Sequence, residues 1–449
     1  MSKKILLVTI AIAGIALITR AQDVVLKIVG GEKPTIAITD FRGAGDSAQY
    51  MNAFNQTLYA DIEDSGLFKM AAKGMYPLQV PQQPSDFQAP AGTTRRGPWL
   101  TDWSSPPASA KYLAFGYAAT QSSQLVLAGW LFDVQQADVA GAQLIGKRYF
   151  GEISDTGARK VAHEFAADII AKFGGMSALG SHIYFVSDRT GGGNKEIWSM
   201  EPDGSNQKRL TFYNSTTITP GISPDGTKLA CTTFAKGNPG IFILSLETGR
   251  QLLFVNPRAS LNATPNFTPD GKHLLFASTA SGRYTNIYMA DPDGGNLQRV
   301  STSLRIEVEP KVNPKTGTDL VFVSGRSGPQ QVWKMSLNGS DAEMLTSGEG
   351  DASNPSWHPN GEIIAFAWTR GLAPGNFNIF LMDVATRRFD QLTHGAGRNE
   401  NPTWGPDGRH LVFASNRKGS MQIFTMLADG THVQQLTTQG RNEMPVWGK

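Results

Sequence analysis

The feature that most constrains this fold is a proline-led motif that occurs six times in the second half of the chain. In every copy an apolar residue follows two positions after the proline. Neighbouring copies are 43 to 47 residues apart, and their prolines are Pro220, Pro265, Pro310, Pro355, Pro402 and Pro445. A period of this length indicates a supersecondary unit that is repeated along the chain.

Each repeat has the signals of four short strands. A turn such as Pro269-Asp270-Gly271 follows the first five copies, and Asp-Gly or Asn-Gly favours a hairpin at most of these turns. Two apolar segments come next, for example 273–278 and 286–290, and then a second turn and a short strand that ends in Leu-Thr. Four strands in about 45 residues are typical of a β-propeller blade.

The number of segments predicts how the ring closes. The apolar strand occurs six times, but its first copy, at 182–187, has no proline-led strand before it. The sixth proline-led strand, at 444–447, has no apolar strand after it. Pairing these two segments completes a sixth blade, and closure leaves few open sheet edges. We therefore expect the segment around Pro445 to form the innermost strand beside residues 182–187.

The region before the repeat mixes helix and strand signals. The sequence therefore predicts an α/β N-terminal domain followed by an all-β six-bladed β-propeller. The expected domains are a signal peptide at 1–21, the α/β domain at 22–175 and the propeller at 176–449. Expected helices cover 47–65 and 158–173, a surface loop covers 77–107, and expected strands cover 24–29, 35–41, 111–118, 125–134 and 143–153.

The N-terminus has the layout of a secretory signal peptide. Lys3 and Lys4 precede an uncharged apolar run at 5–18, and we expect cleavage after Ala21. As a helix this run would span about 21 Å, less than the roughly 30 Å of a bilayer core. We therefore expect export without membrane insertion once the signal is removed. The formal net charge of +3 gives no basis for binding nucleic acid.

The sequence offers no catalytic, cofactor or metal residues. Cys231 is the only cysteine, and its strand-like setting favours a buried structural thiol. The seven histidines lack the spacing of metal ligands, and the Asp-Gly turns lack the ligand pattern of a calcium loop. A Gly-x-Ser-x-Gly nucleophile elbow is missing as well. The expectation is a protein that is not an enzyme.

Several segments, in this order, resemble the TolB family of periplasmic β-propeller proteins over nearly the whole chain. They are 64–68, 159–170, 180–186, 200–206 and 209–211. The resemblance implies a monomeric periplasmic scaffold of the Tol-Pal system, which serves envelope integrity, cell division and protein transport. It further implies that the lipoprotein Pal binds at one mouth of the propeller and that TolA binds the mature N-terminus, with other envelope proteins as further candidate partners. The segments 22–31 and 174–180 depart from the family pattern.

Polar residues at or near the repeated prolines are the candidate Pal-binding rim: Asn262, Thr264, Arg305, Glu309, Asn354, Arg398, Glu400, Arg441 and Glu443. We place the residue before each proline where an innermost strand begins. The alternative for this rim is that it only caps strands and solvates a channel.

The candidate TolA-binding segment is Val24, Val25, Leu26, Lys27, Ile28 and Val29, which could add to the sheet of a partner. The alternative for this segment is an ordered edge strand of its own domain. The alternative function for the whole chain is a periplasmic propeller enzyme, lyase or hydrolase-like, that acts in the central channel.

Overall fold

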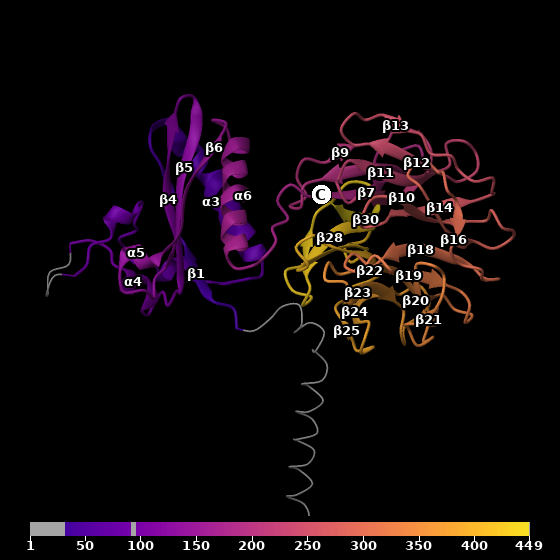
Figure 1. Ribbon diagram of the computed structural model, residues 1–449. Helices are drawn as coiled ribbons and strands as arrows, with labels where there is room; N and C mark the ends of the chain where they lie inside the picture. Colours follow the sequence, from indigo (N-terminus) through magenta and orange to yellow (C-terminus); the bar gives the residue numbers. More distant parts are fainter. Residues whose placement is uncertain (1–31, 91–95, 449) are drawn as a thin grey trace, which may run out of the picture. The chain divides into compact units, whose positions relative to one another are not determined.

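The computed structural model describes residues 32–90 and 96–448, which form two compact units divided between Leu179 and Gly180 (Figure 1). The expected signal peptide at 1–21 and the expected strand and TolA-binding segment at 24–29 lie outside the described residues. The boundary predicted from the sequence, after residue 175, is four residues before this division.

The N-terminal unit is built on one mixed β-sheet with the strand order β3-β1-β4-β5-β6, and β2 pairs with β4. Strand β1 runs parallel to β3 and β4, whereas β4, β5 and β6 are antiparallel. The elements are β1 (Thr35–Ile38), β2 (Arg42–Gly43), η1 (Gly45–Tyr50), α3 (Met51–Asp64), β3 (Lys69–Met70), η2 (Lys73–Met75), η3 (Pro84–Asp86), α4 (Leu100–Ser104), β4 (Tyr112–Gln121), β5 (Gln124–Asp133), α5 (Val139–Ala142), β6 (Gln143–Gly151) and α6 (Asp155–Lys172).

Helices α3 and α6 cover one face of this sheet. Helix α6 buries a stripe at helical spacing, including Val161, Phe165 and Ile169, against the sheet and α3. Its first turn is capped by Ser154, whose hydroxyl accepts a hydrogen bond from the Gly157 N–H at 3.0 Å. Gly157 is required there, because a Cβ atom would lie 2.0 Å from the Glu152 carbonyl oxygen.

The expected surface loop at 77–107 contains more structure than its composition indicates. It includes η3 and α4, and Trp103 of α4 is fully buried against the second face of the sheet. The helix expected at 47–65 is a 3-10 helix up to Tyr50 and an α-helix only from Met51. The proline, glutamine and serine residues at 77–107 made the loop look exposed, but its few large apolar side chains pack it against the sheet.

The C-terminal unit is a six-bladed β-propeller, as the repeat predicts (Figure 1). Each blade is a four-stranded antiparallel sheet. Blade by blade, the strands are β30 (Asn442–Gly448), β7 (His182–Ser187), β8 (Glu196–Met200) and β9 (Lys208–Arg209); β10 (Thr217–Ile222), β11 (Lys228–Thr233), β12 (Gly240–Ser245) and β13 (Gln251–Leu252); β14 (Asn262–Phe267), β15 (Leu274–Ser278), β16 (Asn286–Ala290) and β17 (Gln298–Arg299); β18 (Glu307–Val312), β19 (Asp319–Ser324), β20 (Gln331–Ser336) and β21 (Glu343–Met344); β22 (Ala352–Trp357), β23 (Ile363–Trp368), β24 (Asn378–Asp383) and β25 (Phe389–Gln391); β26 (Asn399–Trp404), β27 (His410–Ser415), β28 (Gln422–Leu427) and β29 (Gln434–Gln435).

The ring closes as the sequence predicts. Strand β30 pairs antiparallel with β7, with Val446 opposite Tyr184 and Glu443 opposite Val186. The Trp447 side chain is buried, and its indole N–H donates to the Ser181 hydroxyl at 2.8 Å. The final strand thus supplies the innermost position of the blade that begins with β7.

The apolar cores of the propeller lie between neighbouring blades. The second strand of each blade is buried on both faces, as in β15, where all five residues are buried. Phe267, Trp357, Trp404 and Trp447, two residues after their prolines, are buried as well, and the first three belong to these cores. This explains why an apolar residue recurs at that place in the motif.

Candidate functional site

The residue before each repeated proline lies inside an innermost strand, at its third position, and not at its start as the sequence led us to expect. Each strand shifts register there, as between Val308 and Lys311 in β18. The backbone at all six positions has a φ between 49° and 57°, in the left-handed region: Thr219, Thr264, Glu309, Asn354, Asn401 and Met444. The proline, which has no N–H, fits the bulge because no ladder bond is needed there.

The bulges turn these residues into links between blades. The Glu309 N–H donates to the Thr264 hydroxyl of the preceding blade at 3.2 Å. The Asn354 N–H and side-chain amide donate to the two Glu309 carboxylate oxygens at 2.7 and 3.0 Å. The Asn401 N–H donates to the Asn354 side-chain oxygen at 3.3 Å. A chain of hydrogen bonds therefore runs around part of the channel.

These bonds between equivalent residues link the strands from β14 to β26, and the contacts beyond the two ends of this series are of other kinds. At one end, the Thr264 N–H donates to Thr232, whose hydroxyl also contacts the Thr219 hydroxyl at 2.7 Å. At the other end stands Met444, whose thioether is at most a weak acceptor. There the contact to β30 comes from the Thr403 hydroxyl, which donates to the Pro445 carbonyl at 2.9 Å. The seam next to β30 is thus bonded differently from the other blade contacts.

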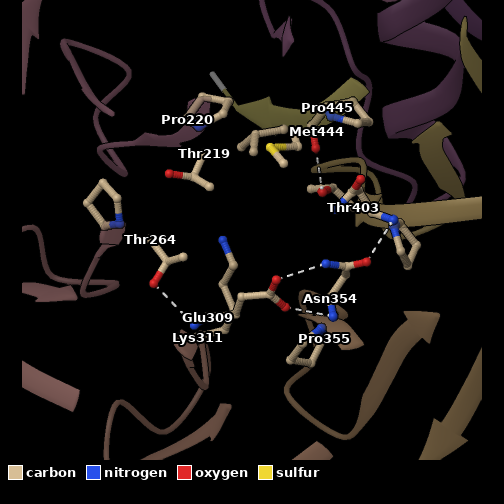
Figure 2. A pocket seen from close by; sticks show the side chains of 14 residues that line it. Thr219, Pro220, Thr264, Glu309, Lys311, Asn354, Pro355, Thr403, Met444 and Pro445 are labelled. Carbon is tan, nitrogen blue, oxygen red and sulfur yellow. Dashed lines mark hydrogen bonds between the residues drawn. The ribbon is translucent and has the colours of Figure 1, made fainter. Parts of the chain in front are cut away.

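These side chains line a cavity of about 110 Å³ in the propeller channel (Figure 2). Glu309 and Lys311 are its two charged residues. Burial raises the pKa of Glu309, although Asn354 and Lys311 oppose the shift. Burial also lowers the pKa of Lys311 to about 8, against the opposing effect of Glu309. The remaining lining is uncharged: Thr219, Pro220, Thr264, Pro265, Asn354, Pro355, Asn401, Pro402, Thr403, Met444, Pro445 and Val446.

A second group of charges lies where the innermost strands begin. Arg398 pairs with Glu400, and Arg441 pairs with Glu443 at 3.0 Å. Lys195 is also paired with Glu443. Because all six innermost strands run in the same direction, these residues share one mouth of the channel.

The two neighbouring acids at this mouth respond differently to their surroundings. Burial raises the pKa of Glu400, and Glu443 adds to this shift, whereas Arg398 opposes it. Burial acts on Glu443 in the same direction, but the bonds from Lys195 and Arg441 outweigh it and lower the pKa of Glu443. The mouth therefore offers acidic and basic side chains that are paired with one another.

The predicted rim residues do not all lie in one place. Thr264, Glu309 and Asn354 line the cavity, and Arg398, Glu400, Arg441 and Glu443 lie at the mouth. Arg305 is exposed just before β18. Asn262 is buried instead, with its side chain bonded to the Ser278 hydroxyl at 2.7 Å and to the Pro257 carbonyl at 3.1 Å, so it braces the blade.

Sequence reasoning missed two cations of this site. Lys311 follows Pro310 in the motif, where the other blades have small or uncharged residues, and this departure was a signal in the sequence. Lys195 comes from the loop before β8 and reaches Glu443 of β30 only because the ring closes. No local pattern marks a contact of this kind.

The profile of the family described as the TolB β-propeller domain matches residues 171–371 and 347–449. The chain belongs to the TolB β-propeller family. It is 32% identical over 229 residues to the TolB homologue of Chlorobium luteolum, which covers 51% of this chain and 50% of that protein. The TolB homologue of Chlorobium chlorochromatii is 33% identical over 216 residues, or 48% of this chain and 46% of that protein. The match thus spans about half the length of these TolB relatives.

A solved structure extends the likeness in fold to the N-terminal unit. The crystal structure of TolB from Acinetobacter baumannii has a TM-score of 0.76 and covers 93% of this chain and 97% of that chain, at 21% identity. The α/β unit before the propeller is therefore part of the TolB architecture. Within the described ranges, no helix is long and apolar enough to span a membrane.

Proposed function

We propose that this chain is a non-catalytic, periplasmic protein-binding scaffold of the Tol-Pal system, which serves envelope integrity and cell division. Pal docks at the mouth of the propeller, and TolA binds the mature N-terminal segment, residues 24–29. The observation that carries the proposal is a propeller of the TolB family whose channel mouth gathers Arg398, Glu400, Arg441 and Glu443.

The chemistry of the mouth suits a protein partner. Charged rims steer the approach of a partner, and exposed apolar side chains supply area that association can bury. Leu304 and Ile306, on either side of Arg305 just before β18, are 77% and 50% exposed. Phe212, in the loop before β10, is 66% exposed. A mixed surface of this kind favours docking of a folded or extended polypeptide.

The alternative, an enzyme that works in the channel, has less support. Within residues 32–90 and 96–448, no three His, Cys, Asp or Glu side chains are grouped so that they could hold a metal ion. The acid of the cavity, Glu309, accepts two hydrogen bonds from Asn354 and is held in place by them. This arrangement fits a structural link better than a general acid or base.

A binding assay with purified Pal and the periplasmic part of TolA tests the proposal. The full chain is compared with the double variant Arg305→Glu and Arg398→Glu, whose side chains are exposed, and with a deletion of residues 22–33. We expect the rim variant to lose Pal and keep TolA, and the deletion to lose TolA and keep Pal. Lys315→Glu is the charge control, because Lys315 lies in the turn after β18, at the end of that strand opposite the mouth.

Two results would contradict the proposal. If the unaltered protein captures neither partner, the scaffold function is wrong. If the rim variant binds Pal as tightly as Lys315→Glu does, the mouth is not the docking site. Circular dichroism of each variant shows whether it is folded before binding is compared.

A further inference from the structure

Of the six residues that directly follow the repeated prolines, Lys311 is the charged one. The position after each repeated proline holds Gly221, Asn266, Lys311, Ser356, Thr403 and Val446 in the six blades. Five of these side chains are uncharged and short. Figure 2 shows the Lys311 side chain extending toward the open centre, between Thr219, Thr264 and Glu309.

The Glu309 carboxylate is hydrogen-bonded to Asn354 and not to the Lys311 amine. Both Glu309 oxygens accept hydrogen bonds from Asn354. The acceptor within bonding distance of Lys311 Nζ, among the described residues, is the side-chain oxygen of Asn266 at 2.9 Å, with the Asn266 amide turned so that its nitrogen faces the Phe267 carbonyl. An ammonium has three N–H donors. Lys311 therefore presents donors to the cavity.

A cation in this position is electrostatically undercompensated. Removing an ammonium from water is costly unless an anion or several acceptors replace the water. The charged residue that faces Lys311 from its own strand is Glu309. The neighbouring strands place uncharged Thr219, Thr264, Asn354 and Thr403 around the cavity. Glu309 already supplies one negative charge to this cavity, so a singly charged anion is the most that the one ammonium can accept, whereas a phosphate dianion would need a second cation.

We propose that Lys311 is the receiving group for a carboxylate that the docking partner inserts into the propeller channel. The inference rests on the proposed function, because it names the chemistry of the partner group that enters the same site. The carboxylate comes from an Asp or Glu side chain or from a chain terminus. It accepts a charge-assisted hydrogen bond from Nζ, and channel hydroxyls such as Thr219 can complete its shell.

Amine labelling of the full chain tests this without the partner. Acetylation of Lys311 by acetic anhydride is followed by peptide mass spectrometry, with and without small carboxylates as probes. N-acetylglutamic acid α-amide imitates a side-chain carboxylate, N-acetylglutamine a chain terminus, and neutral N-acetylglutaminamide is the control. A probe at twice its Kd should slow the labelling of Lys311 about threefold. Lys315, exposed outside the cavity, should be labelled at an unchanged rate.

Each outcome decides the proposal. Protection of Lys311 by either anion and not by the neutral amide supports it, and the more protective anion identifies the source. Equal labelling with all three probes overturns it. Lys311→Gln should then weaken Pal binding while Lys315→Gln does not. If unaltered protein binds Pal but no probe protects Lys311, the carboxylate inference fails alone; if it binds no Pal, the proposed function fails.

Discussion

The residue before each repeated proline meets two demands. Its backbone adopts a left-handed φ that costs a residue with a Cβ atom about 1 kcal/mol. In Thr264, Glu309 and Asn354 the side chain also accepts the N–H of the equivalent residue in the next blade. Asparagine tolerates the left-handed region better than most residues. The strain and the bond between blades are therefore linked at one position.

Two substitutions at Asn354 separate these effects. Asn354→Ala removes the amide bonds to Glu309 and Asn401 and keeps a Cβ atom at positive φ, so we expect a loss of about 3 kcal/mol in unfolding free energy. Asn354→Gly removes the same bonds but relaxes the backbone, and should lose about 1 kcal/mol less. Urea unfolding followed by tryptophan fluorescence measures both. Equal losses would show that the backbone is unstrained.

Lys311 gives a pH-dependent prediction. Its pKa is lowered by burial to about 8, so between pH 8 and its ordinary value the unfolded chain binds a proton that the folded protein does not. Its contribution to stability therefore rises with pH in that window, and the full penalty applies below it. Lys311→Met should raise the unfolding free energy at pH 7 by about 1 kcal/mol, after allowance for solvent screening.

The gain from Lys311→Met should shrink as pH rises toward 10, because the folded wild-type protein loses the charge first. Urea midpoints at pH 7 and pH 9.5 measure this change. Lys315→Met, at an exposed lysine, should show no such trend. A gain that is the same at both pH values would mean that the charge of Lys311 is not penalised. A lysine kept at a cost to stability fits a binding role.

For single residues, the sequence predicted which ones lie together better than it predicted the role of each. Thr264, Glu309 and Asn354 were picked because they precede prolines, and the structure places them in one cavity. Their bulge was not foreseen, because the residue before a proline normally favours extended backbone. Asn262 differs because its side chain bonds Ser278 on the next strand of its own blade, and its position in the motif does not reveal that bond.

At the scale of elements, strand β30 joins the two ends of the ring, and Trp447 anchors it. The indole is buried and donates to Ser181. Trp447→Ala should lower the unfolding free energy of the propeller by about 3–5 kcal/mol, because it leaves a cavity where the buried indole packs. Thermal unfolding by calorimetry measures this loss as a lower Tm.

Phe212→Ala is the matched control for Trp447→Ala, since Phe212 is an aromatic residue that is 66% exposed. It should change stability by no more than about 0.5 kcal/mol. If both variants have the same Tm, β30 contributes little to closure. Deleting residues 444–449 should destabilise the whole propeller further, because β7 then loses its neighbour in the sheet.

The strands of the propeller could be predicted because the same sequence signals recur in each repeat. Turn residues mark the hairpins, and the unmatched copies at 182–187 and 444–447 indicate their pairing. The N-terminal unit has no repeat, and its short elements β2, β3, α4 and α5 were not predicted. Elements of two to five residues have too little periodicity to be distinguished from loop, and long-range packing decides them.

At the scale of the whole molecule, each unit has its own sheets and cores, and the chain divides between Leu179 and Gly180. We therefore expect residues 180–449 to fold alone into the propeller. Far-ultraviolet circular dichroism of this fragment should show an all-β spectrum and one cooperative thermal transition. A fragment that lacks the transition would show that the propeller needs the N-terminal unit, and residues 30–179 alone are the complementary control.

The pairing of β30 with β7 also means that the first blade can be completed only after the end of the chain has been synthesised. Arg189 and Asn442, which bond across this seam, are 253 residues apart. A ribosome delivers the first partner long before the second, so five blades emerge while β7 still has an unsatisfied edge. During that interval the nascent chain is exposed to proteases, and the open edge of β7 can pair with strands of other proteins. If synthesis stops before β30, the truncated product keeps an unpaired β7 edge, by which proteases and chaperones can recognise it.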